Sequence, residues 1–327
     1  MIAYKKSATW IASAFFLSIA AVNGSAQEFP TRPVKIMVPS PPGSGTDVLA
    51  RLLADLLSRR WQSPVFVENG SGVATGNVAA AEVSRSAPDG YTLLLCPPGP
   101  ISTNALLYKK LNYDPQKWVV ISHLATVPYV LALRKNFEAS TVQELVAEAK
   151  AKPKTITSAS AGPGSSGTLA ADNLELMAGI QFVTVPYRGL GPAMNDLIAG
   201  QVDMMFDTLT TSLPLHQAGN VKIVGVGTEK RVSALPEVST IAEAGLPGFK
   251  SLTWFGLVAP PGTAEALANK INGDVVAIIK SPEVGEKIRN MQMEPVGSSR
   301  REAAEFFASE SRYWGKVVKD ANVALEE

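Results

Sequence analysis

The sequence contains few of the residues that build metal centres and catalytic dyads. Its 327 residues include one cysteine, Cys96, and two histidines, His123 and His216. A single cysteine excludes an intramolecular disulfide and a cysteine-based zinc cluster, and histidines about ninety positions apart argue against a metal site. We therefore expect no metal and no cofactor. We interpret both histidines as structural or surface residues, and Cys96 as a small buried thiol at the end of a strand.

Positive charge is not concentrated anywhere in the chain, because no run of lysine and arginine is longer than two residues. The sequence has 30 basic and 29 acidic residues, and removal of residues 1–26, with Lys5 and Lys6, would leave 28 basic against 29 acidic residues. Nucleic-acid-binding surfaces need a basic footprint. We therefore expect no nucleic-acid partner.

Long apolar runs are missing after the N-terminus, where residues 8–22 follow Lys5 and Lys6 and lead to Ser25 and Ala26. An apolar run of about 15 residues is short for a membrane span, and small residues at its exit are typical of a cleaved leader. We predict a signal peptide over 1–26 and a periplasmic mature protein. Every later apolar run is interrupted by glycine, proline or charge within about a dozen residues, so we expect no transmembrane helix there.

Strand-like and helical patterns alternate through the remaining chain. A first series predicts strands over 33–40, 64–69 and 91–96 and helices over 46–61 and 76–88. A second series begins with two extended stretches joined near Pro128, and it continues with helices over 141–153, 168–179 and 191–200 and strands over 155–160, 181–187, 202–208, 221–227 and 251–260. Helical patterns over 264–281 and 301–321 have no strands of their own, so we expect them to return to the first series. This alternation predicts an α/β fold with a mostly parallel sheet and helices on both faces.

Two similar loops, "PSPPGSGTD" at 39–47 and "SASAGPGSSGT" at 158–168, each join a strand to a helix. Glycine allows close backbone approach, and serine and threonine supply hydroxyl groups at a helix start. The free N–H groups of a helix N-terminus carry roughly half a positive charge and can bind an anion without lysine or arginine. The pair predicts a site in which two helix N-termini, one from each series, hold one anion between them.

Three other motifs fit these loops poorly. A Walker loop needs lysine after its last glycine, and threonine follows Gly45. The dinucleotide fingerprint needs a third glycine where Val48 stands, although Glu68 lies where a ribose-binding acid would lie. The hydrolase motif G-x-S-x-G fails because Pro163 and Thr168 occupy its glycine positions. A dinucleotide enzyme is weakened but stays open, as does a secreted hydrolase or isomerase acting on a small carboxylate.

Seven segments in a single order give the chain a family resemblance: "FPTRPVKIMVPSPPGSGTDVLAR", "VENGSGVATGNVAAAEVSRSAPDGYTLL", "YDPQKW", "GPGSSGTLAADNLELMAGIQFVTVPYRGLGPAMNDLIAGQVDMMFD", "ALPEVSTIAEAGLPGF", "WFGLVAPPGT" and "YWGKVVK". Together they extend over essentially the whole mature chain. On these segments the chain resembles the Bug-family extracytoplasmic solute receptors, the TctC-type substrate-binding components of tripartite tricarboxylate transporters.

The resemblance implies a periplasmic-binding-protein fold of type II, in which two doubly wound α/β lobes are joined by crossover strands around a ligand cleft. We place lobe 1 at residues 27–127 and 254–327, and lobe 2 at residues 128–253. The resemblance implies a receptor rather than an enzyme, which closes like a flytrap on a small mono- or dicarboxylate, aliphatic or aromatic. It also implies a monomer whose partners are the ligand and the integral-membrane permease subunits of the transporter.

The resemblance further implies that both loops bind the ligand carboxylate, partly through ordered waters. Carried onto this chain, the loops supply Gly43, Ser44, Gly45, Thr46 and Asp47 from the first, and Ser160, Ala161, Gly164, Ser165, Ser166 and Gly167 from the second. Further candidates are Thr75, Tyr187, Asp207 and Thr208. Pro42 and Pro163 also lie in the loops, but proline lacks an N–H group and cannot donate to an anion.

Overall fold

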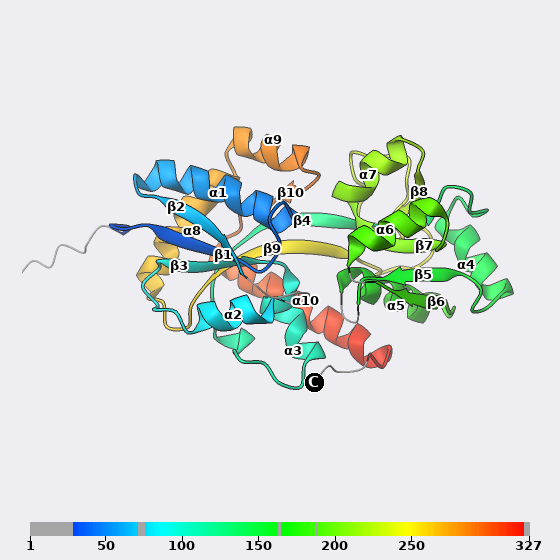
Figure 1. Cartoon of the computed structure of the whole chain (residues 1–327), viewed down its shortest axis with the longest axis horizontal. Coiled ribbons are helices and arrows are strands. Elements are labelled where there is room, and N and C mark those ends of the chain that lie inside the picture. Colours follow the sequence, from blue (N-terminus) through cyan, green and yellow to red (C-terminus); the bar gives the residue numbers. More distant parts are fainter. Residues whose placement is uncertain (1–28, 71–75, 163–164, 188, 324–327) are drawn as a thin grey trace, which may run out of the picture.

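The structure is a computed structural model of the whole chain. It describes residues 29–70, 76–162, 165–187 and 189–323 (Figure 1). The predicted signal peptide over 1–26 lies outside the described residues, as do two candidate ligand-binding residues, Thr75 and Gly164. Within the described ranges, no helix is both long and apolar enough to cross a membrane.

The elements form two groups that are linked by two long strands, β4 (Val119–Arg134) and β9 (Leu252–Ala259) (Figure 1). What we call the terminal group begins with β1 (Val34–Val38), α1 (Gly45–Trp61), β2 (Val65–Asn69), α2 (Asn77–Ser84), β3 (Thr92–Cys96), the π-helical turn η1 (Gly99–Thr103), α3 (Asn104–Leu107) and the 3₁₀ turn η2 (Pro115–Lys117). It is completed by α8 (Glu265–Ile279), α9 (Pro282–Asn290), β10 (Glu294–Pro295) and α10 (Arg300–Asp320).

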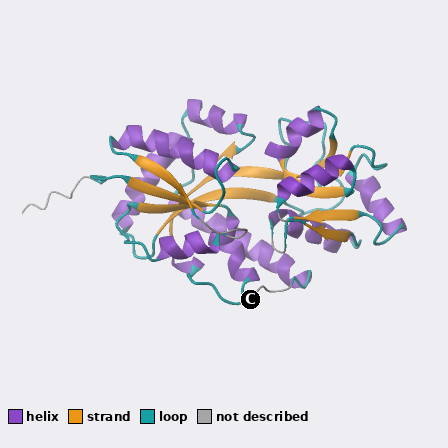
Figure 2. Cartoon of the chain, in the orientation of Figure 1, coloured by secondary structure: helices purple, strands orange, loops and turns teal. Residues whose placement is uncertain are grey.

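What we call the central group lies between the two linking strands in the sequence. It contains α4 (Val142–Ala151), β5 (Thr157–Ser160), α5 (Ser166–Ala178), β6 (Val183–Pro186), α6 (Leu190–Ala199), β7 (Met204–Thr208), α7 (Leu209–Gln217) and β8 (Val221–Val226). In each group, helices cover both faces of the strands, as the sequence predicts (Figure 2).

The strands form one mixed sheet in the order β2-β1-β3-β9-β4-β7-β5-β6, and β8 and β10 each pair with β4. β2, β1 and β3 are parallel to one another, as are β7, β5 and β6. The pairings of β3 with β9, β9 with β4 and β4 with β7 are antiparallel. The expectation of a mostly parallel sheet therefore holds for each outer trio and is wrong for the centre, where the two linking strands run in opposite directions.

β4 carries the chain from one group into the other. Residues 119–128 pair with β9, residues 129–133 pair with β7, and residues 130–134 pair with β8. The two extended stretches expected from the sequence are thus a single strand, and its partners change at Pro128. Proline has no N–H group to donate to a neighbouring strand, so it suits the position where the pairing with β9 ends.

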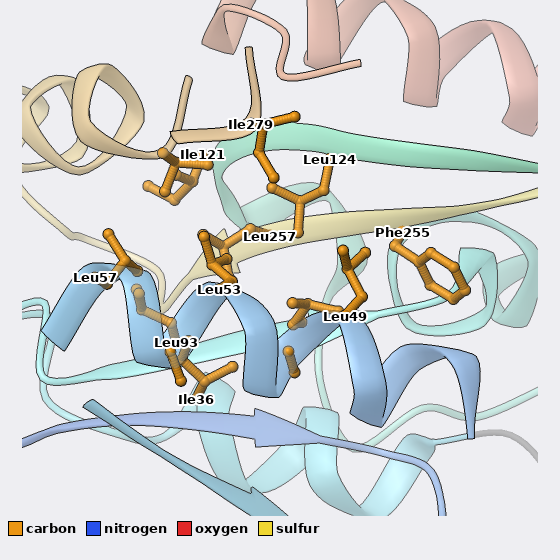
Figure 3. Packing of buried hydrophobic residues seen from close by; sticks show 14 of the residues in the cluster. Ile36, Leu49, Leu53, Leu57, Leu93, Ile121, Leu124, Phe255, Leu257 and Ile279 are labelled. Atoms are coloured by element: carbon orange, nitrogen blue, oxygen red, sulfur yellow. The ribbon is translucent and has the colours of Figure 1, made fainter. Parts of the chain in front are cut away.

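The core of the terminal group fixes the position of α1. Leu49, Leu53 and Leu57 recur every four residues and are fully buried (Figure 3). They lie in one hydrophobic cluster with Ile36 of β1 and Leu257 of β9. Full burial of a leucine side chain stabilises a fold by about 1.5–3 kcal/mol. This stripe therefore holds α1 on the sheet, with the first turn of the helix close to the end of β1.

The C-terminal helices pack on the terminal group, as expected from their lack of strands. Ile271 of α8 lies in the cluster of the α1 leucines, and Phe307 of α10 lies in a second cluster with Cys96 and Trp254. Cys96 is fully buried, and burial raises the pKa of its thiol, which confirms the expected buried cysteine. The central group has separate clusters, the largest of which surrounds Phe206.

Candidate functional site

The first loop is shaped by its own hydroxyl and carboxylate groups. Ser44 is the N-cap of α1, and its hydroxyl accepts a hydrogen bond from Asp47 N at 3.3 Å. Gly43 has a φ of +81°, a left-handed conformation that favours glycine, and its N–H group donates to Asp47 Oδ2 at 2.8 Å. Ser44 N donates to the carbonyl oxygen of Pro41 at 3.3 Å. The N–H groups of Gly43 and Ser44 are therefore already paired within the loop.

Asp47 supports this loop from the inside, with 2% of its surface exposed. Besides Gly43 N, its carboxylate accepts hydrogen bonds from Arg51 Nε at 2.9 Å and Asn69 Nδ2 at 2.9 Å. Burial acts to raise the pKa of Asp47, but the hydrogen bonds from Arg51, Gly43 and Asn69 together lower it by more, so the pKa lies below its usual value. Asp47 is ionised and paired within the protein, where it braces the turn.

The second loop is held by three hydroxyl groups. Ser165 is the N-cap of α5, and its hydroxyl accepts a hydrogen bond from Thr168 N at 3.3 Å. The Thr168 hydroxyl lies 2.7 Å from Ser160 Oγ and 2.8 Å from Ser165 Oγ. Gly162, with a φ of +111°, donates its N–H group to Ser160 Oγ at 3.2 Å, and Ala161 is half-buried beside it. This chain of hydroxyls ties the end of β5 to the first turn of α5.

The two loops leave corresponding N–H groups open. The N–H groups of Gly45 and Thr46, the two residues after the N-cap of α1, have no acceptor among the described residues. The same holds for Ser166 and Gly167 after the N-cap of α5, within the part of the chain that is described. The first N–H groups of a helix have no intrahelical acceptor, and the helix dipole favours an anion in front of them. Each loop therefore presents two neighbouring donors, although neither 39–47 nor 158–168 contains lysine or arginine.

Both helix N-termini lie close to the boundary between the two groups (Figure 1). Leu169, one turn into α5, packs in a cluster with residues of α3 and α10 from the terminal group. Near the other loop, a Cβ atom at Gly45 would lie 3.2 Å from Met293 Cε. Met293 follows α9, and Thr210 of α7 in the central group donates a hydrogen bond to the carbonyl oxygen of Met291 at 3.1 Å. The loops thus approach the boundary from opposite groups.

Gly167 is required by a close approach between α5 and β7. A Cβ atom at this position would lie 2.6 Å from the carbonyl oxygen of Phe206 and 3.4 Å from Cε1 of Tyr129. A carbon–oxygen separation of 2.6 Å is a steric clash, so a larger residue would displace the start of α5 from the sheet. This contact therefore sets where the open N–H groups of the second loop lie.

Two of the remaining candidates lie at strand ends of the central group, since Tyr187 directly follows β6 and Thr208 is the last residue of β7. The Tyr187 hydroxyl donates to Asp196 Oδ2 at 2.7 Å. Thr208 is the N-cap of α7, and its hydroxyl lies 3.1 Å from Thr211 Oγ1. Both hydroxyls thus have one partner in their own group, and Tyr187 would have to give up its bond to Asp196 to donate to a ligand carboxylate.

Asp207, at the end of β7, is fully buried beside α7. Its Oδ2 atom accepts a hydrogen bond from Ser212 Oγ at 2.8 Å, whereas Oδ1 has no hydrogen-bond partner among the described residues. Burial raises the pKa of Asp207 to about 6, although the hydrogen bond from Ser212 acts to lower it. Of the candidate residues, Asp207 is therefore the one whose carboxylate most clearly lacks a hydrogen-bond donor.

Both histidines have structural surroundings, as expected. The His123 ring is buried and stacks on Phe306 at a centroid distance of 4.2 Å, and its Nε2 atom lies 3.1 Å from Thr126 Oγ1. Burial lowers the pKa of His123 to about 4, so the ring is neutral near pH 7. His216 Nδ1 accepts a hydrogen bond from Ile223 N at 3.2 Å. The described residues hold no cluster of three or more His, Cys, Asp or Glu side chains that could bind a metal.

Three supporting residues were not among the sequence candidates: Thr168, Arg51 and Asn69. Thr168 is the third residue after the N-cap Ser165, the position whose N–H group meets a capping side chain. Arg51 follows Asp47 by four residues, which is the spacing of a helical ion pair. Asn69 ends β2 opposite Val38 of the parallel strand β1, so it emerges at the edge of the sheet that carries the first loop. The signals for Thr168 and Arg51 are local spacings in the sequence, whereas the signal for Asn69 requires the strand order.

Comparison with known proteins places these loops in a family context. A family model described as tripartite tricarboxylate transporter family receptor (TctC) matches residues 49–323. The solved structure of the R. palustris protein Rpa4515 with adipate is 35% identical, with a TM-score of 0.83, and the likeness covers 91% of this chain and 100% of that chain.

Two further solved structures show the same fold. The periplasmic binding protein BugD is 32% identical, with a TM-score of 0.78 and coverage of 91% of this chain and 100% of that chain. MatC (Rpa3494) from Rhodopseudomonas palustris with bound malate is 32% identical, with a TM-score of 0.76 and coverage of 89% of this chain and 100% of that chain. These likenesses confirm the expected periplasmic-binding-protein fold and the expected family resemblance.

Proposed function

The chain belongs to the receptors of the tripartite tricarboxylate transporter family, and from this we propose that it binds a small carboxylate and delivers it to the membrane permease of such a transporter. Rpa4515 and MatC, which are similar over most of the chain, were solved with adipate and malate, and both of these ligands are dicarboxylates. The observation that carries the proposal is the matched pair of helix N-termini. We place the ligand carboxylate at the open N–H groups of Gly45, Thr46, Ser166 and Gly167.

The chemistry of these donors suits a carboxylate. Hydrogen bonds to a charged group contribute about 1.5–3 kcal/mol each, and four backbone donors can bind a carboxylate without a cationic side chain. The donors are rigid because the Ser44 and Ser165 caps fix the first turns of their helices. We propose the side chains of Tyr187, Asp207 and Thr208 as further contacts for the rest of the ligand. Thr75 and Gly164, which lie outside the described residues, are proposed as contacts from the sequence alone.

We assign the two groups to two lobes, with lobe 1 at 27–127 and 254–327 and lobe 2 at 128–253. Contacts that a ligand makes with both lobes at once exist only when the lobes are close together, so binding shifts the protein toward the closed arrangement. The closed monomer would then be recognised by the permease. A signal peptide over 1–26 would direct the receptor to the periplasm, where the family member BugD resides as a periplasmic binding protein.

The competing function is a secreted hydrolase or isomerase that acts on a small carboxylate. We propose instead that the ligand is released unchanged, because His123 is buried against Phe306 and His216 is bonded to the backbone of Ile223. Mass spectrometry after incubation of the protein with adipate or malate distinguishes the two functions. Recovery of the unchanged acid supports the receptor, and accumulation of a transformed product supports the enzyme.

Isothermal titration calorimetry on residues 27–327 tests the proposed site with adipate, malate and the uncharged analogue adipamide. We expect saturable binding of at least one diacid and none of adipamide. In the variant Ser165→Asp, aspartate can still cap α5, but it places negative charge beside the bound carboxylate. We expect its Kd to rise at least tenfold, which corresponds to about 1.4 kcal/mol.

The matched control is Thr141→Asp at the N-cap of α4. Thr141 is exposed and accepts a hydrogen bond from Glu144 N at 3.2 Å, so this change also places an aspartate at a helix N-terminus of the central group. We expect its Kd to equal that of the unchanged protein. Equal affinities for Ser165→Asp and the unchanged protein would remove the second loop from the binding site.

A further inference from the structure

The helix that carries the second loop is also held from the other group. Leu169 and Asn173 lie four residues apart on α5, so they share one face of the helix. Leu169, 1% exposed, packs in a cluster with Leu107 of α3 and Trp314 of α10. Asn173, 5% exposed, donates a hydrogen bond from Nδ2 to the hydroxyl of Tyr313 in α10 at 2.9 Å. This face of α5 therefore contacts the terminal group over at least one turn.

The hydroxyl of Tyr313 joins three segments of the chain. Besides the bond from Asn173, it accepts a hydrogen bond from Lys250 N at 3.0 Å and donates one to the carbonyl oxygen of Lys250 at 3.1 Å. A tyrosine hydroxyl has one proton to donate and lone pairs that accept, and these three bonds use it fully. Lys250 lies two residues before β9, so Tyr313 meets the central group at the point where the chain leaves it.

Glu310, which lies one turn before Tyr313 in α10, contacts the same residue, Lys250, through an ion pair. Its carboxylate is 1% exposed and pairs with Lys250 Nζ at 2.5 Å. It also accepts hydrogen bonds from Trp254 Nε1 at 3.3 Å and Trp314 Nε1 at 3.2 Å. Both the backbone and the side chain of Lys250 are thus fixed by α10, in a contact where Glu310 is buried and Lys250 and Tyr313 are half-buried.

We infer that Tyr313 and Asn173 are positioning residues that set ligand affinity by fixing the orientation of α5 relative to the terminal group. This inference rests on the proposed binding of a carboxylate at the loops. Ser166 and Gly167 lie on the first turn of α5, and a helix of 13 residues behaves as a rigid rod over the distance from Gly167 to Asn173. A restraint at Asn173 therefore limits how far the open N–H groups can turn away from those of the first loop.

Loss of the restraint lowers affinity without removing any ligand contact. The N–H groups of the second loop would sample more orientations, and only the fraction of molecules with the binding orientation would bind. In Tyr313→Phe, the ring and its packing are retained, and the three hydrogen bonds of the hydroxyl are lost. Asn173→Ala removes the α5 side of the same contact. We expect each variant to raise the Kd for adipate or malate about tenfold, and we expect the double variant to raise it no further than the larger of the two.

Tyr91→Phe is the matched control. The Tyr91 hydroxyl accepts a hydrogen bond from Thr31 N at 2.9 Å and lies 3.1 Å from Thr31 Oγ1, so this change also removes hydrogen bonds of a tyrosine hydroxyl, but they are exposed and lie within the terminal group. We expect Tyr91→Phe to lower the melting temperature and to leave the Kd unchanged. If the role of Tyr313 is purely structural, Tyr313→Phe will likewise lower the melting temperature and leave the Kd unchanged. An unchanged Kd in Tyr313→Phe, measured well below its melting temperature, therefore overturns the inference.

Hydrogen exchange without ligand separates a failure of this inference from a failure of the proposed function. In the ligand-free protein, we expect the hydrogen-bonded amides of Thr168 and Leu169 to exchange at least fivefold faster in Tyr313→Phe than in the unchanged protein and in Tyr91→Phe. If the unchanged protein binds neither diacid, the proposed function fails, and this exchange difference still decides whether α10 restrains α5. Equal exchange rates at residues 168 and 169 in all three proteins overturn the restraint itself.

Discussion

Asp207 and Ser212 form a buried pair in which the serine hydroxyl donates to Asp207 Oδ2 at 2.8 Å and leaves Asp207 Oδ1 without a partner among the described residues. The hydrogen bonds from Ser212 and from the backbone of Thr208 do not compensate this carboxylate for the loss of water. Burial accordingly raises the pKa of Asp207 from 3.8 to about 6, against the opposing effect of the Ser212 hydrogen bond. The buried carboxylate of Asp207 therefore either lowers the stability of the fold or serves a function.

The pH dependence of stability measures this cost. Because the folded-state pKa of Asp207 lies above its unfolded value, the folded protein holds the proton more tightly, and the free energy of unfolding falls as pH rises from about 4 to about 6. The full effect at pH 7 is on the order of 3 kcal/mol. We expect Asp207→Asn to be more stable than the unchanged protein at pH 7.5, with the difference vanishing near pH 4. Urea unfolding across this range checks the prediction.

Asp203, four residues before Asp207, is a control whose pKa is shifted in the opposite direction. Burial acts to raise its pKa, but hydrogen bonds from Thr157 and Arg134 outweigh burial and place the pKa below its usual value. Its stabilising effect is therefore present above the unfolded pKa and is lost as pH falls through the folded pKa. Asp203→Asn should lose stability at pH 7.5 and differ less at low pH. If both variants shift stability in the same direction at pH 7.5, burial of charge does not explain Asp207.

Substitution of Gly167 tests the close approach of α5 to β7. In Gly167→Ala the new Cβ atom would lie 2.6 Å from the carbonyl oxygen of Phe206, so α5 must shift outward. We expect a loss of about 1–3 kcal/mol in the free energy of unfolding and a weaker affinity for a dicarboxylate, because the open N–H groups of the second loop move with the helix. Urea unfolding and calorimetric titration measure the two effects.

Gly191→Ala in α6 is the control for this change. Among the described residues, and apart from the adjoining chain and the backbone of α6 itself, no heavy atom lies within 4 Å of the Cβ position at Gly191, so alanine fits there without strain. Alanine favours the helix over glycine by about 1 kcal/mol, and we expect equal or higher stability with unchanged affinity. A Gly167→Ala variant as stable as Gly191→Ala would show that α5 is not in tight contact with the sheet.

The sequence predicts the fold well where the signal is local. The α1 helix follows from leucines that recur at helical spacing, and both loops follow from Gly, Ser and Thr at the start of a helix. The helix α9 is missed because it is short and carries only a two-residue apolar stripe, Val284 and Ile288. The single long strand β4 is also missed, because Pro128 reads locally as an interruption and only its change of partners explains its position.

The candidate site is predictable in part for the same reason. The caps Ser44 and Ser165 can be recognised from neighbouring residues. The contact between Asn173 and Tyr313 cannot, because the two residues are 140 positions apart and neither stands in a recognisable motif. The burial of Asp207 beside α7 depends on the packing of the whole central group, which a strand pattern over 202–208 does not contain.

Removal of the Asp47 carboxylate tests whether the first loop depends on its internal brace. Asp47→Ala deletes the acceptor for Gly43 N, Arg51 Nε and Asn69 Nδ2, and we expect a loss of about 2 kcal/mol in the free energy of unfolding. The turn before α1 would loosen, so we also expect a higher Kd for a dicarboxylate. Asp55→Ala is the control on the same helix, because the exposed ion pair of Asp55 with Arg59 contributes about 0.5 kcal/mol or less. Urea unfolding and calorimetry compare the two variants, and an Asp47→Ala protein that retains both stability and affinity contradicts a bracing role for this carboxylate.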